Sequence, residues 1–435
     1  MIVLSNLGKT STLGEMKTMK FKPSELGHIP AEWEVKSLGE LWDDFRTGPF
    51  GSALHAQDYV TGGTPLINPM HIQDGKICPT SDMSVDKATE QRLSIYRLSK
   101  DDIIIGRRGE MGRAALVREE EAGWLCGTGC FFLRMKDVMS PDFVTRYLRT
   151  PTCVSVLEGE AVGTTLVNLN QAILGRVNVP VPPLSEQRKI ATALSDVDEM
   201  IAALEKLIEK KRMVKTGAMQ RLLTGKTRLP GFKGAWVEKC LGELGYGVRG
   251  VGYKPWQSGT SPMVGRVQLL RSNNVQDGRL NFNDVVYVDE CCVSDGQRMR
   301  VGDILICAAN GSRNLVGKAA PLLVEREVTF GAFMSVFRCH DNNQAAFVGH
   351  LLNSGTYKQK LDDILTGSAI NNLNVSDIED MRFFVPPTLA EQKAIAKVLG
   401  DMDEEIAALE AELAKAHQLK QGMMQELLTG KVRLG

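Results

Sequence analysis

Apolar residues recur at alternating steps of four and three in two long stretches of the chain, one central and one C-terminal. A sustained step of about 3.5 residues is typical of a coiled-coil seam, so both stretches are predicted to be long helices. Each follows a proline pair, Pro182-Pro183 or Pro386-Pro387, where proline costs no helical hydrogen bond. The seam positions are Ile190, Leu194, Val197, Ile201, Leu204 and Ile208, and then Ile395, Leu399, Met402, Ile406, Leu409 and Leu413.

The two stretches are copies of each other. Residues 184–229 align with 389–434 at a constant offset of 205, and 26 of the 46 positions are identical. Helices of about 40 residues extend roughly 60 Å, and one apolar stripe on such a helix needs a partner, for which the other copy is the obvious candidate. Thr388 with Glu391 predicts a capping box, and Gly225 and Gly430 are predicted C-terminal stops.

The regions before the helices match more weakly. "EWEVKSLGEL" (32–41) resembles "AWVEKCLGEL" (235–244), and "SKDDIIIGRRGEMGRAAL" (99–116) parallels "RVGDILICAANGSRNLVGKAA" (300–320). Short β-rich runs such as "DDIIIG", "VGDILICA", "CFFLRM" and "MSVFRC" predict strands, and residues 140–150 and 343–354 predict short helices. The chain is therefore a tandem duplication of a mixed α and β domain followed by a helix, an α+β fold.

The tripeptide Gly225-Lys226-Thr227 raises the possibility of a phosphate-binding loop, and Gly8-Lys9-Thr10 repeats it. Such a loop needs a further glycine five residues earlier, after a buried strand and before a helix. Gln220 and Val3 occupy those positions, and the segment before Gly225 is charged and helix-forming. The C-terminal copy has Val432 in place of Thr227, so a nucleotide-binding enzyme is nearly excluded.

The amino-acid composition further limits the kinds of protein that this chain can be. The 435 residues carry 52 basic and 52 acidic side chains, for a formal net charge of zero. This balance argues against tight DNA binding by the chain alone through a broad basic face. No apolar run is long enough to span a membrane. Cys126 and Cys130 form a close pair without a second pair, so no metal site is predicted, and free thiols suit a reducing cytoplasm.

The skeleton resembles the DNA-specificity subunit of type I restriction–modification systems. The resemblance rests on the "NLN…VPVPPLSEQRKIA" entry into the first helix, the duplicated "LLTGK" exit, the "GDIL" strand and the "DG" turn, and covers about residue 28 to the end. Asp101-Asp102 stand where the family usually has Gly-Asp, and we expect the strand to survive this departure.

The resemblance implies a domain plan. It comprises an N-terminal extension (1–27), target-recognition domain 1 (28–183), a central helical region (184–229), target-recognition domain 2 (230–387) and a C-terminal helical region (388–435). Each recognition domain is expected to read one half of a split DNA sequence. The helices are expected to pack antiparallel with internal pseudo-twofold symmetry, set the gap and dock two modification (methyltransferase) subunits.

The resemblance also implies that the partner subunits, and not this chain, carry out the catalysis. The modification subunits are expected to bind S-adenosylmethionine and methylate adenine, and restriction subunits are expected to use ATP and Mg²⁺ for translocation and cleavage. This chain is expected to be non-catalytic and to bind no cofactor. An adenine methyltransferase is expected to hold its flipped base with an [NDS]-P-P-[YF] motif. The two proline pairs of this chain are followed by Leu184 and Thr388, so neither pair matches that motif.

Arg, Lys, Asn and Gln on loops are the usual readers of base edges. In the first domain the predicted DNA contacts are Arg46, Thr47, Asn68, His71, Arg107, Arg108 and Arg113. In the second they are Arg249, Tyr253, Lys254, Arg271, Asn273, Asn274, Asn310, Arg313 and Lys318. The predicted docking or scaffold positions are Glu186, Gln187, Leu222, Leu223, Thr224, Gly225 and Lys226, with Glu391, Gln392, Leu427, Leu428, Thr429, Gly430 and Lys431.

Two alternatives remain open from the residues. A structural coiled-coil adaptor would carry the same helices without reading DNA, and an inactive orphan specificity protein would have the same sequence features. First-turn acids such as Glu186 and Glu391 are also favoured simply by the helix dipole.

Overall fold

The computed structural model describes residues 20–161, 168–341, 345–366 and 371–434. The chain divides into two compact units, Met1–Ala203 with Leu413–Gly435, and Leu204–Glu412. Each unit contains one globular domain and part of both long helices. The N-terminal Gly8-Lys9-Thr10 lies outside the described residues.

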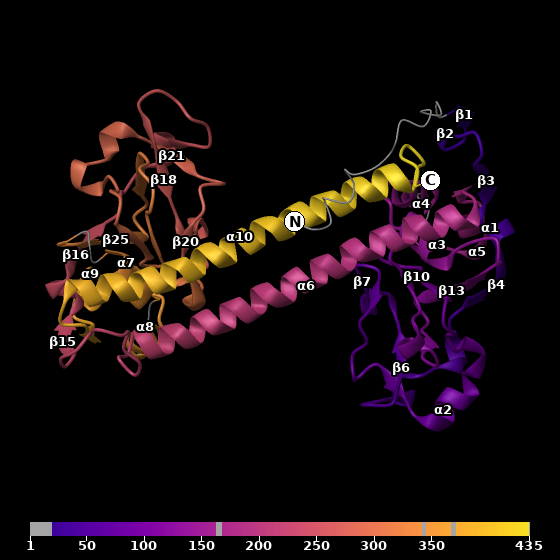
Figure 1. The fold of residues 1–435 in the computed structure, drawn as a ribbon, viewed down its shortest axis with the longest axis horizontal. Helices are drawn as coiled ribbons and strands as arrows, with labels where there is room; N and C mark the ends of the chain where they lie inside the picture. The colour runs from indigo at the N-terminus through magenta and orange to yellow at the C-terminus, as the bar shows by residue number, and fades with distance from the viewer. Residues whose placement is uncertain (1–19, 162–167, 342–344, 367–370, 435) are drawn as a thin grey trace. The chain divides into compact units, whose positions relative to one another are not determined.

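The two long helices are α6 (Leu184–Leu222) and α10 (Leu389–Leu427), each uninterrupted over 39 residues (Figure 1). They run antiparallel within each unit. In the second unit Lys211 pairs with Glu405 and Lys215 with Asp403, so positions rise along one helix as they fall along the other. In the first unit Lys420 of α10 pairs with Asp198 of α6. The predicted fold class is confirmed.

The first domain is built on two four-stranded sheets. One has the order β11-β10-β13-β4 and the other β12-β6-β9-β5. The strands are β4 (Trp42–Thr47), β10 (Ile103–Gly106), β11 (Ala114–Leu116) and β13 (Cys130–Met135), then β5 (Tyr59–Val60), β6 (Thr64–Ile67), β9 (Ser84–Val85) and β12 (Leu125–Cys126).

Short strand pairs and helices complete the first unit. The pairs are β1 (Phe21–Ser24) with β2 (Gly27–Pro30), β3 (Glu34–Ser37) with β14 (Asn178–Val181), and β7 (Ile72–Gln73) with β8 (Lys76–Ile77). The helices are α1 (Leu38–Leu41), α2 (Lys87–Arg92), α3 (Pro141–Leu148), α4 (Pro151–Ala161) and α5 (Gln171–Gly175). The β1–β2 hairpin lies across the predicted boundary at residue 27.

The second domain repeats this plan. Its sheets have the orders β16-β25-β22-β23 and β17-β21-β18-β24. The strands are β16 (Gly245–Arg249), β22 (Ile304–Cys307), β23 (Ala319–Pro321) and β25 (Met334–Cys339), then β17 (Ser258–Gly259), β18 (Arg266–Leu270), β21 (Val286–Asp289) and β24 (Val328–Phe330). Two pairs follow, β15 (Val237–Cys240) with β26 (Arg382–Val385) and β19 (Val275–Gln276) with β20 (Arg279–Leu280), and the helices are α7 (Ala345–Leu351), α8 (Gly355–Thr366) and α9 (Val375–Glu379).

Local signals explain several of these elements. The "DG" turns close the β7–β8 and β19–β20 hairpins, and both residues of each turn have positive φ, as a type I′ turn requires. Asp101 has φ of 65° where the second domain has Gly302 at 93°. Aspartate tolerates this left-handed backbone, so strand β10 forms as expected despite the missing glycine.

The aspartate that precedes the central strand, Asp102 in the first domain and Asp303 in the second, has the same structural role in both. Asp102 accepts from the backbone N–H of Ser99 and pairs with Arg134 of β13 through both carboxylate oxygens. Asp303 does the same with Arg300 and Arg338. The buried carboxylate therefore joins the start of one central strand to its neighbour.

Each domain core includes the ends of both helices. In the first unit Ile190 and Leu194 of α6 join Leu427 of α10 around Trp33. In the second unit Leu222 of α6 packs in the same cluster as Ile395 of α10. Helix and domain thus share one apolar core in each unit.

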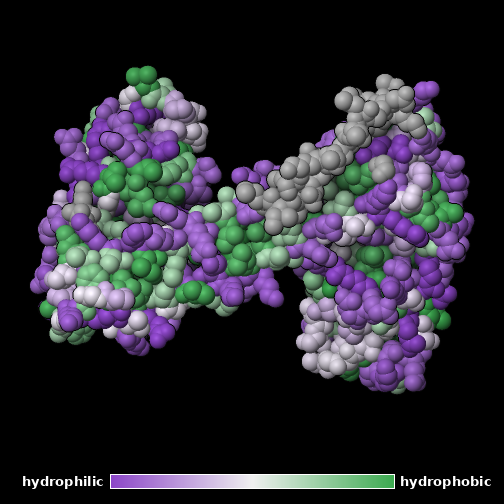
Figure 2. All heavy atoms as spheres, viewed as in Figure 1, coloured by the Kyte–Doolittle hydropathy of each residue, from purple (hydrophilic) through white to green (hydrophobic). Residues whose placement is uncertain are grey.

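Hydrophilic and apolar residues intermingle over the visible face (Figure 2), and no described helix is long and apolar enough to cross a membrane.

Candidate nucleic-acid interface

The loops that carry the predicted DNA contacts meet at one edge of the central sheet in each domain. In the first domain Arg107 follows β10, and its backbone N–H donates to the carbonyl of Gly129, just before β13. The loop after β4 approaches the same place, since the N–H of Gly48 donates to the carbonyl of Cys130. Strand pairing therefore assembles three separate loops into one surface.

An arginine and two aromatic rings lie close together at this place in the first domain. The Arg107 guanidinium lies 4.8 Å from the ring centroid of Phe50 and 5.2 Å from that of Phe131. Its Nε donates to Oδ1 of Asn168, while Nη1 is buried without a partner among the described residues. Burial, and then the neighbouring charge of Arg108, lower the pKa of Arg107.

The second domain has a cavity at the corresponding edge. It measures about 1050 Å³, and three predicted residues, Tyr253, Arg271 and Asn310, line it. The Asn310 amide donates to Ser272 Oγ at 3.1 Å, and Nε of Arg271 is buried with no partner within the described part of the chain. Three of the predicted residues are therefore brought together from loops far apart in sequence.

Backbone hydrogen bonds show which residues of the two domains occupy equivalent positions at this edge. Gly250 N–H donates to Met334 as Gly48 donates to Cys130, and Ala308 N–H donates to Phe333 as Arg107 donates to Gly129. The strand registers Thr47↔Phe131 and Arg249↔Ser335 agree. The residues at the positions of Phe50, Arg107 and Phe131 are therefore Gly252, Ala308 and Ser335. Of these three, Gly252 lines the cavity, whereas Ala308 and Ser335 are not among the lining residues.

Besides Tyr253, two aromatic residues near this edge were not predicted. Phe333 lines the cavity and is 73% exposed, and Trp256, 72% exposed, lies 5.1 Å from the Lys254 ammonium. Aligning "CGTGC" with "FGAFM" at an offset of 204 would have drawn attention to Phe333, because it replaces Gly129 at a turn.

Two predicted residues are buried at equivalent positions. Nδ1 of His71 accepts the N–H of Asn68, and its Nε2 lies 3.3 Å from Thr80 Oγ1. Asn274 accepts the N–H of Arg271 and donates to the carbonyl of Asn281. Both side chains close the loop that precedes a "DG" hairpin, so we leave them out of the interface that we propose.

The remaining predicted contacts are spread over the loops. Arg46 pairs with Asp44, Arg113 with Glu110, and Asn273 bonds Asp284. Thr47 ends β4, and Oδ1 of Asn68 accepts from Gly129 N–H. Arg313 donates to Thr366 Oγ1. Four more predicted cations are exposed, as Arg46 and Arg313 are: Arg108, Arg249, Lys254 and Lys318.

The predicted scaffold acids lie in internal contacts. Glu186, at the entry to α6, accepts from Trp33 Nε1 at 3.1 Å and from Arg433 beyond the end of α10. Glu391, at the entry to α10, accepts from Trp236 Nε1 at 3.4 Å and from Arg228 beyond the end of α6. The entry of one helix is thereby bonded to the exit of the other. Glu391 N–H still donates to Thr388 Oγ1, but its carboxylate is engaged by Arg228, so only half of the predicted capping box forms.

The neighbouring glutamines are buried as well. Gln187 donates to the Pro182 carbonyl and accepts from Ser140 N–H. Gln392 donates to the Pro386 carbonyl, while its Oε1 is buried without a partner among the described residues. These amides hold the proline turn against the first turn of each helix.

The "LLTGK" segments are helix exits. Leu222-Leu223 and Leu427-Leu428 are buried in the two domain cores. Thr224 and Thr429 donate to the carbonyls four residues earlier, whereas Lys226 and Lys431 are exposed. Gly225 and Gly430 have φ of 69° and 75° and lie against Trp236 and Trp33, where a Cβ would approach the rings at 3.2 and 3.0 Å. The motif follows a helix instead of opening one, unlike a phosphate loop.

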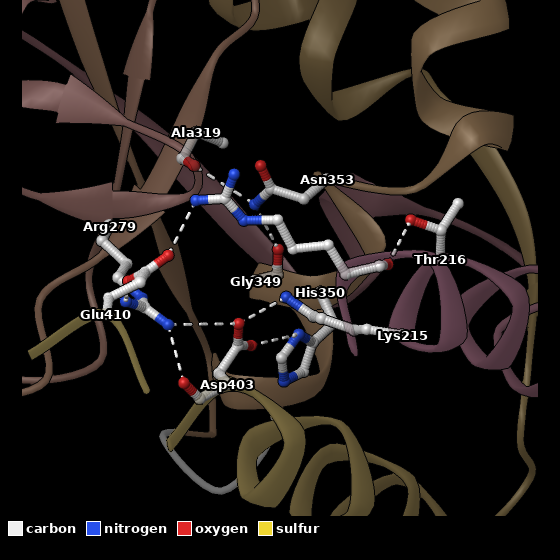
Figure 3. A network of polar contacts seen from close by, with 10 residues as sticks. Lys215, Thr216, Arg279, Ala319, Gly349, His350, Asn353, Asp403 and Glu410 are labelled. Carbon is white, nitrogen blue, oxygen red and sulfur yellow. Dashed lines mark hydrogen bonds and ion pairs between the residues drawn. The ribbon is translucent and has the colours of Figure 1, made fainter. Parts of the chain in front are cut away.

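A polar network ties each domain to the helices. In the second unit (Figure 3) Asp403 of α10 contacts Lys215 Nζ at 2.6 Å, Arg279 of β20 at 3.7 Å and His350 of α7 at 3.9 Å. Arg279 also bonds Glu410 at 3.1 Å. Burial is the main cause that lowers the pKa of His350 to about 4.

The first unit has an equivalent network. Asp198 of α6 pairs with Lys420 at 2.6 Å and with Arg146 of α3 at 2.8 Å. Asp198 and Lys420 each lie 205 positions from their counterparts, Asp403 and Lys215. The helix repeat thus preserves the attachment of the domains while the recognition edges differ. Within the described residues, no group of three or more metal-ligating side chains is found.

Comparisons with known proteins agree with this architecture. The family model for the type I restriction modification DNA specificity domain matches twice, over residues 30–211 and 235–418. The putative type I restriction enzyme MjaX specificity subunit of Methanocaldococcus jannaschii is 27% identical over 441 residues, covering 96% of this chain and 98% of that protein. The EcoKI specificity subunit of Escherichia coli K12 is 30% identical over 197 residues, 45% of this chain and 42% of that protein.

Two solved structures share the fold. The S subunit of the type I restriction–modification system from M. genitalium gives a TM-score of 0.59 at 16% identity, covering 95% of this chain and 98% of that one. A chain from a study of complex assembly and conformational transition in a type I R-M system gives 0.55 at 18% identity, covering 93% and 99%.

Proposed function

Because the chain belongs to the family of type I restriction–modification DNA specificity proteins, we propose that its two domains each read one half of a split, asymmetric DNA site. The chain is a specificity subunit with two target-recognition domains. Such a subunit acts on DNA within a complex of other subunits. The half-site assignment is our own.

One observation carries this assignment. The contacts that attach each domain to the helices are repeated: Glu391 and Asp403 in the second unit correspond to Glu186 and Asp198 in the first. The loops at the edge of the central sheet, in contrast, differ between the two domains. A repeated frame with divergent loops suits two different half-sites. At the first edge the Arg107 guanidinium lies near the rings of Phe50 and Phe131, whereas the second edge has a cavity.

The helices are proposed to set the gap between the half-sites and to dock two modification subunits. A continuous 39-residue helix extends about 58 Å, and half-sites are spaced by turns of the duplex of about 34 Å. A repeated helix also offers two similar surfaces to two copies of one partner. Since the scaffold acids are buried, the docking surface is expected on exposed helix faces, including Val214 and Leu419, which are 205 positions apart.

The chemistry is proposed to reside in the partners. The modification subunits would bind S-adenosylmethionine and methylate adenine, and restriction subunits would use ATP and Mg²⁺. This chain would supply only the sequence preference. Its zero net charge agrees with partners that contribute most of the phosphate contacts.

Methylation mapping tests the proposal. The chain is expressed with its modification subunit in a host without adenine methylation, and the modified positions are sequenced. One two-part motif with a fixed gap is expected. If no methylation appears although the complex forms, the chain is an inactive orphan or a structural adaptor.

A further inference from the structure

We propose that the cavity of the second domain receives a single base that has swung out of the DNA duplex, whereas the first domain reads its half-site without one. This inference rests on the proposed function, namely that the second domain reads DNA. It assigns the cavity an occupant of stated chemistry, a planar nucleobase with its attached sugar.

The first domain has a large side chain, Phe50, at the position where the second domain has Gly252. Gly252 lines the cavity, and no atom lies within 4 Å of the Cβ that a side chain would add there. A planar ligand from outside therefore has room to enter the second domain. The cavity of about 1050 Å³ lies at the upper end of sizes that enclose drug-sized ligands.

The walls offer the contacts that an unstacked base requires. Phe333 and Tyr253 line the cavity, and the Phe333 ring is mostly exposed although it is large and apolar. Aromatic side chains replace the stacking that a base loses when it leaves the duplex, and they accept any base. An exposed ring at the rim of a cavity is thus placed to stack on a base that enters.

Polar groups at the same place suit the edge and backbone of a nucleotide. Arg271 lines the cavity, and its side chain is 40% exposed with only a long contact of 3.6 Å from Nη2 to Asp284, so its guanidinium is placed to reach a base oxygen or nitrogen. Arg249 ends β16 and Lys254 follows Tyr253 in the chain, and both are exposed beside the residues that line the cavity. They are placed for the phosphates of the displaced nucleotide.

A substitution that imitates the first domain tests the cavity directly. Gly252 stands where the first domain has Phe50, no atom lies within 4 Å of the Cβ that a side chain would add, and its φ is not positive. Gly252→Phe is therefore expected to fold and to fill the cavity. Phe333→Ala removes the exposed wall, and Leu323→Ala, also exposed at 70% but outside the cavity lining, is the matched control.

The measurement uses the complex of the full chain with its modification subunits. After the methylation motif is mapped, the half read by the second domain is identified by exchanging residues 1–183. Duplexes then carry a fluorescent base analogue that brightens when unstacked, one position at a time, through that half. The methylated base is expected to brighten because methyltransferases flip their target, and it serves as an internal marker of productive binding.

In the native complex one further position in that half is expected to brighten several-fold. Gly252→Phe and Phe333→Ala should return that position to the duplex level and weaken binding roughly ten-fold. The methylated base should remain bright, and Leu323→Ala should change neither signal. If no position except the methylated base brightens, or if the extra signal survives Gly252→Phe, the inference is overturned while the proposed function stands. Absence of any methylation motif would overturn both.

Discussion

Arg228→Met is the substitution that most directly tests the contact between the C-terminal end of α6 and the N-terminal end of α10. Arg228 donates Nε and Nη2 to the two carboxylate oxygens of Glu391, at 2.8 and 2.5 Å. The Glu391 side chain is only 1% exposed, and its carboxylate also accepts from Trp236 Nε1 at 3.4 Å. Removing the arginine would leave a buried carboxylate with one weak donor.

The expected cost follows from this geometry. Breaking a buried ion pair by removing one partner costs roughly 3–5 kcal/mol, because the remaining charge is uncompensated. Arg228 itself is 24% exposed, so water can reach the vacated space and the low end applies. We expect Arg228→Met to reduce the free energy of unfolding of the second unit by about 3 kcal/mol.

Urea unfolding of the full chain, with a double-mutant cycle, measures this cost. In a Glu391→Gln background the same change should cost only about 1 kcal/mol, since a neutral amide needs less compensation. Arg382→Met is the matched control, because its pairing with Glu238 is long at 3.7 Å and exposed. That control should stay within about 0.5 kcal/mol. A loss below 1 kcal/mol for Arg228→Met, or additive effects in the cycle, would refute the reasoning.

Three further predictions follow from the described contacts. Val214→Asp and Leu419→Asp should each weaken the docking of one modification subunit at least ten-fold without changing stability, as measured by the stoichiometry of complex assembly. If both variants still bind two modification subunits as tightly as the native chain, the proposed docking surface is contradicted. His350 stays neutral in the fold because its pKa is lowered to about 4, while the unfolded state takes up a proton below about pH 6.5. Stability should therefore fall by up to about 3 kcal/mol as pH drops from 6.5 to 4, and His350→Asn should remove this part of the loss in pH-dependent unfolding. The chain alone should bind DNA weakly and with little selectivity because its net charge is zero, and tight, selective binding in a titration without partners would contradict this.

The sequence predicted the parts of the fold that local patterns encode. The heptad steps located both helices, and the β-rich runs located the central strands β10, β13, β22 and β25. The "DG" turns and the strand after Asp101 also formed as expected. Each of these depends on residues close together in the chain, so periodicity and turn chemistry were sufficient.

The sequence pattern could not predict contacts between residues that are far apart in the chain. Nothing near Glu186 in sequence indicates that Arg433 will bond to it, because the contact depends on how the helix ends meet the domain core. His71 and Asn274 were predicted as DNA contacts by residue type, yet both are buried in loop closures. The cavity was also missed, since its lining comes from several loops that lie far apart in the sequence.

The central claim is that each recognition domain independently specifies one half of a split site. Exchanging residues 1–183 for the matching segment of another family member, followed by methylation mapping, tests it most directly. The account predicts that one half of the motif changes while the other half and the gap are retained. A motif altered in both halves, or an unchanged motif, would contradict it.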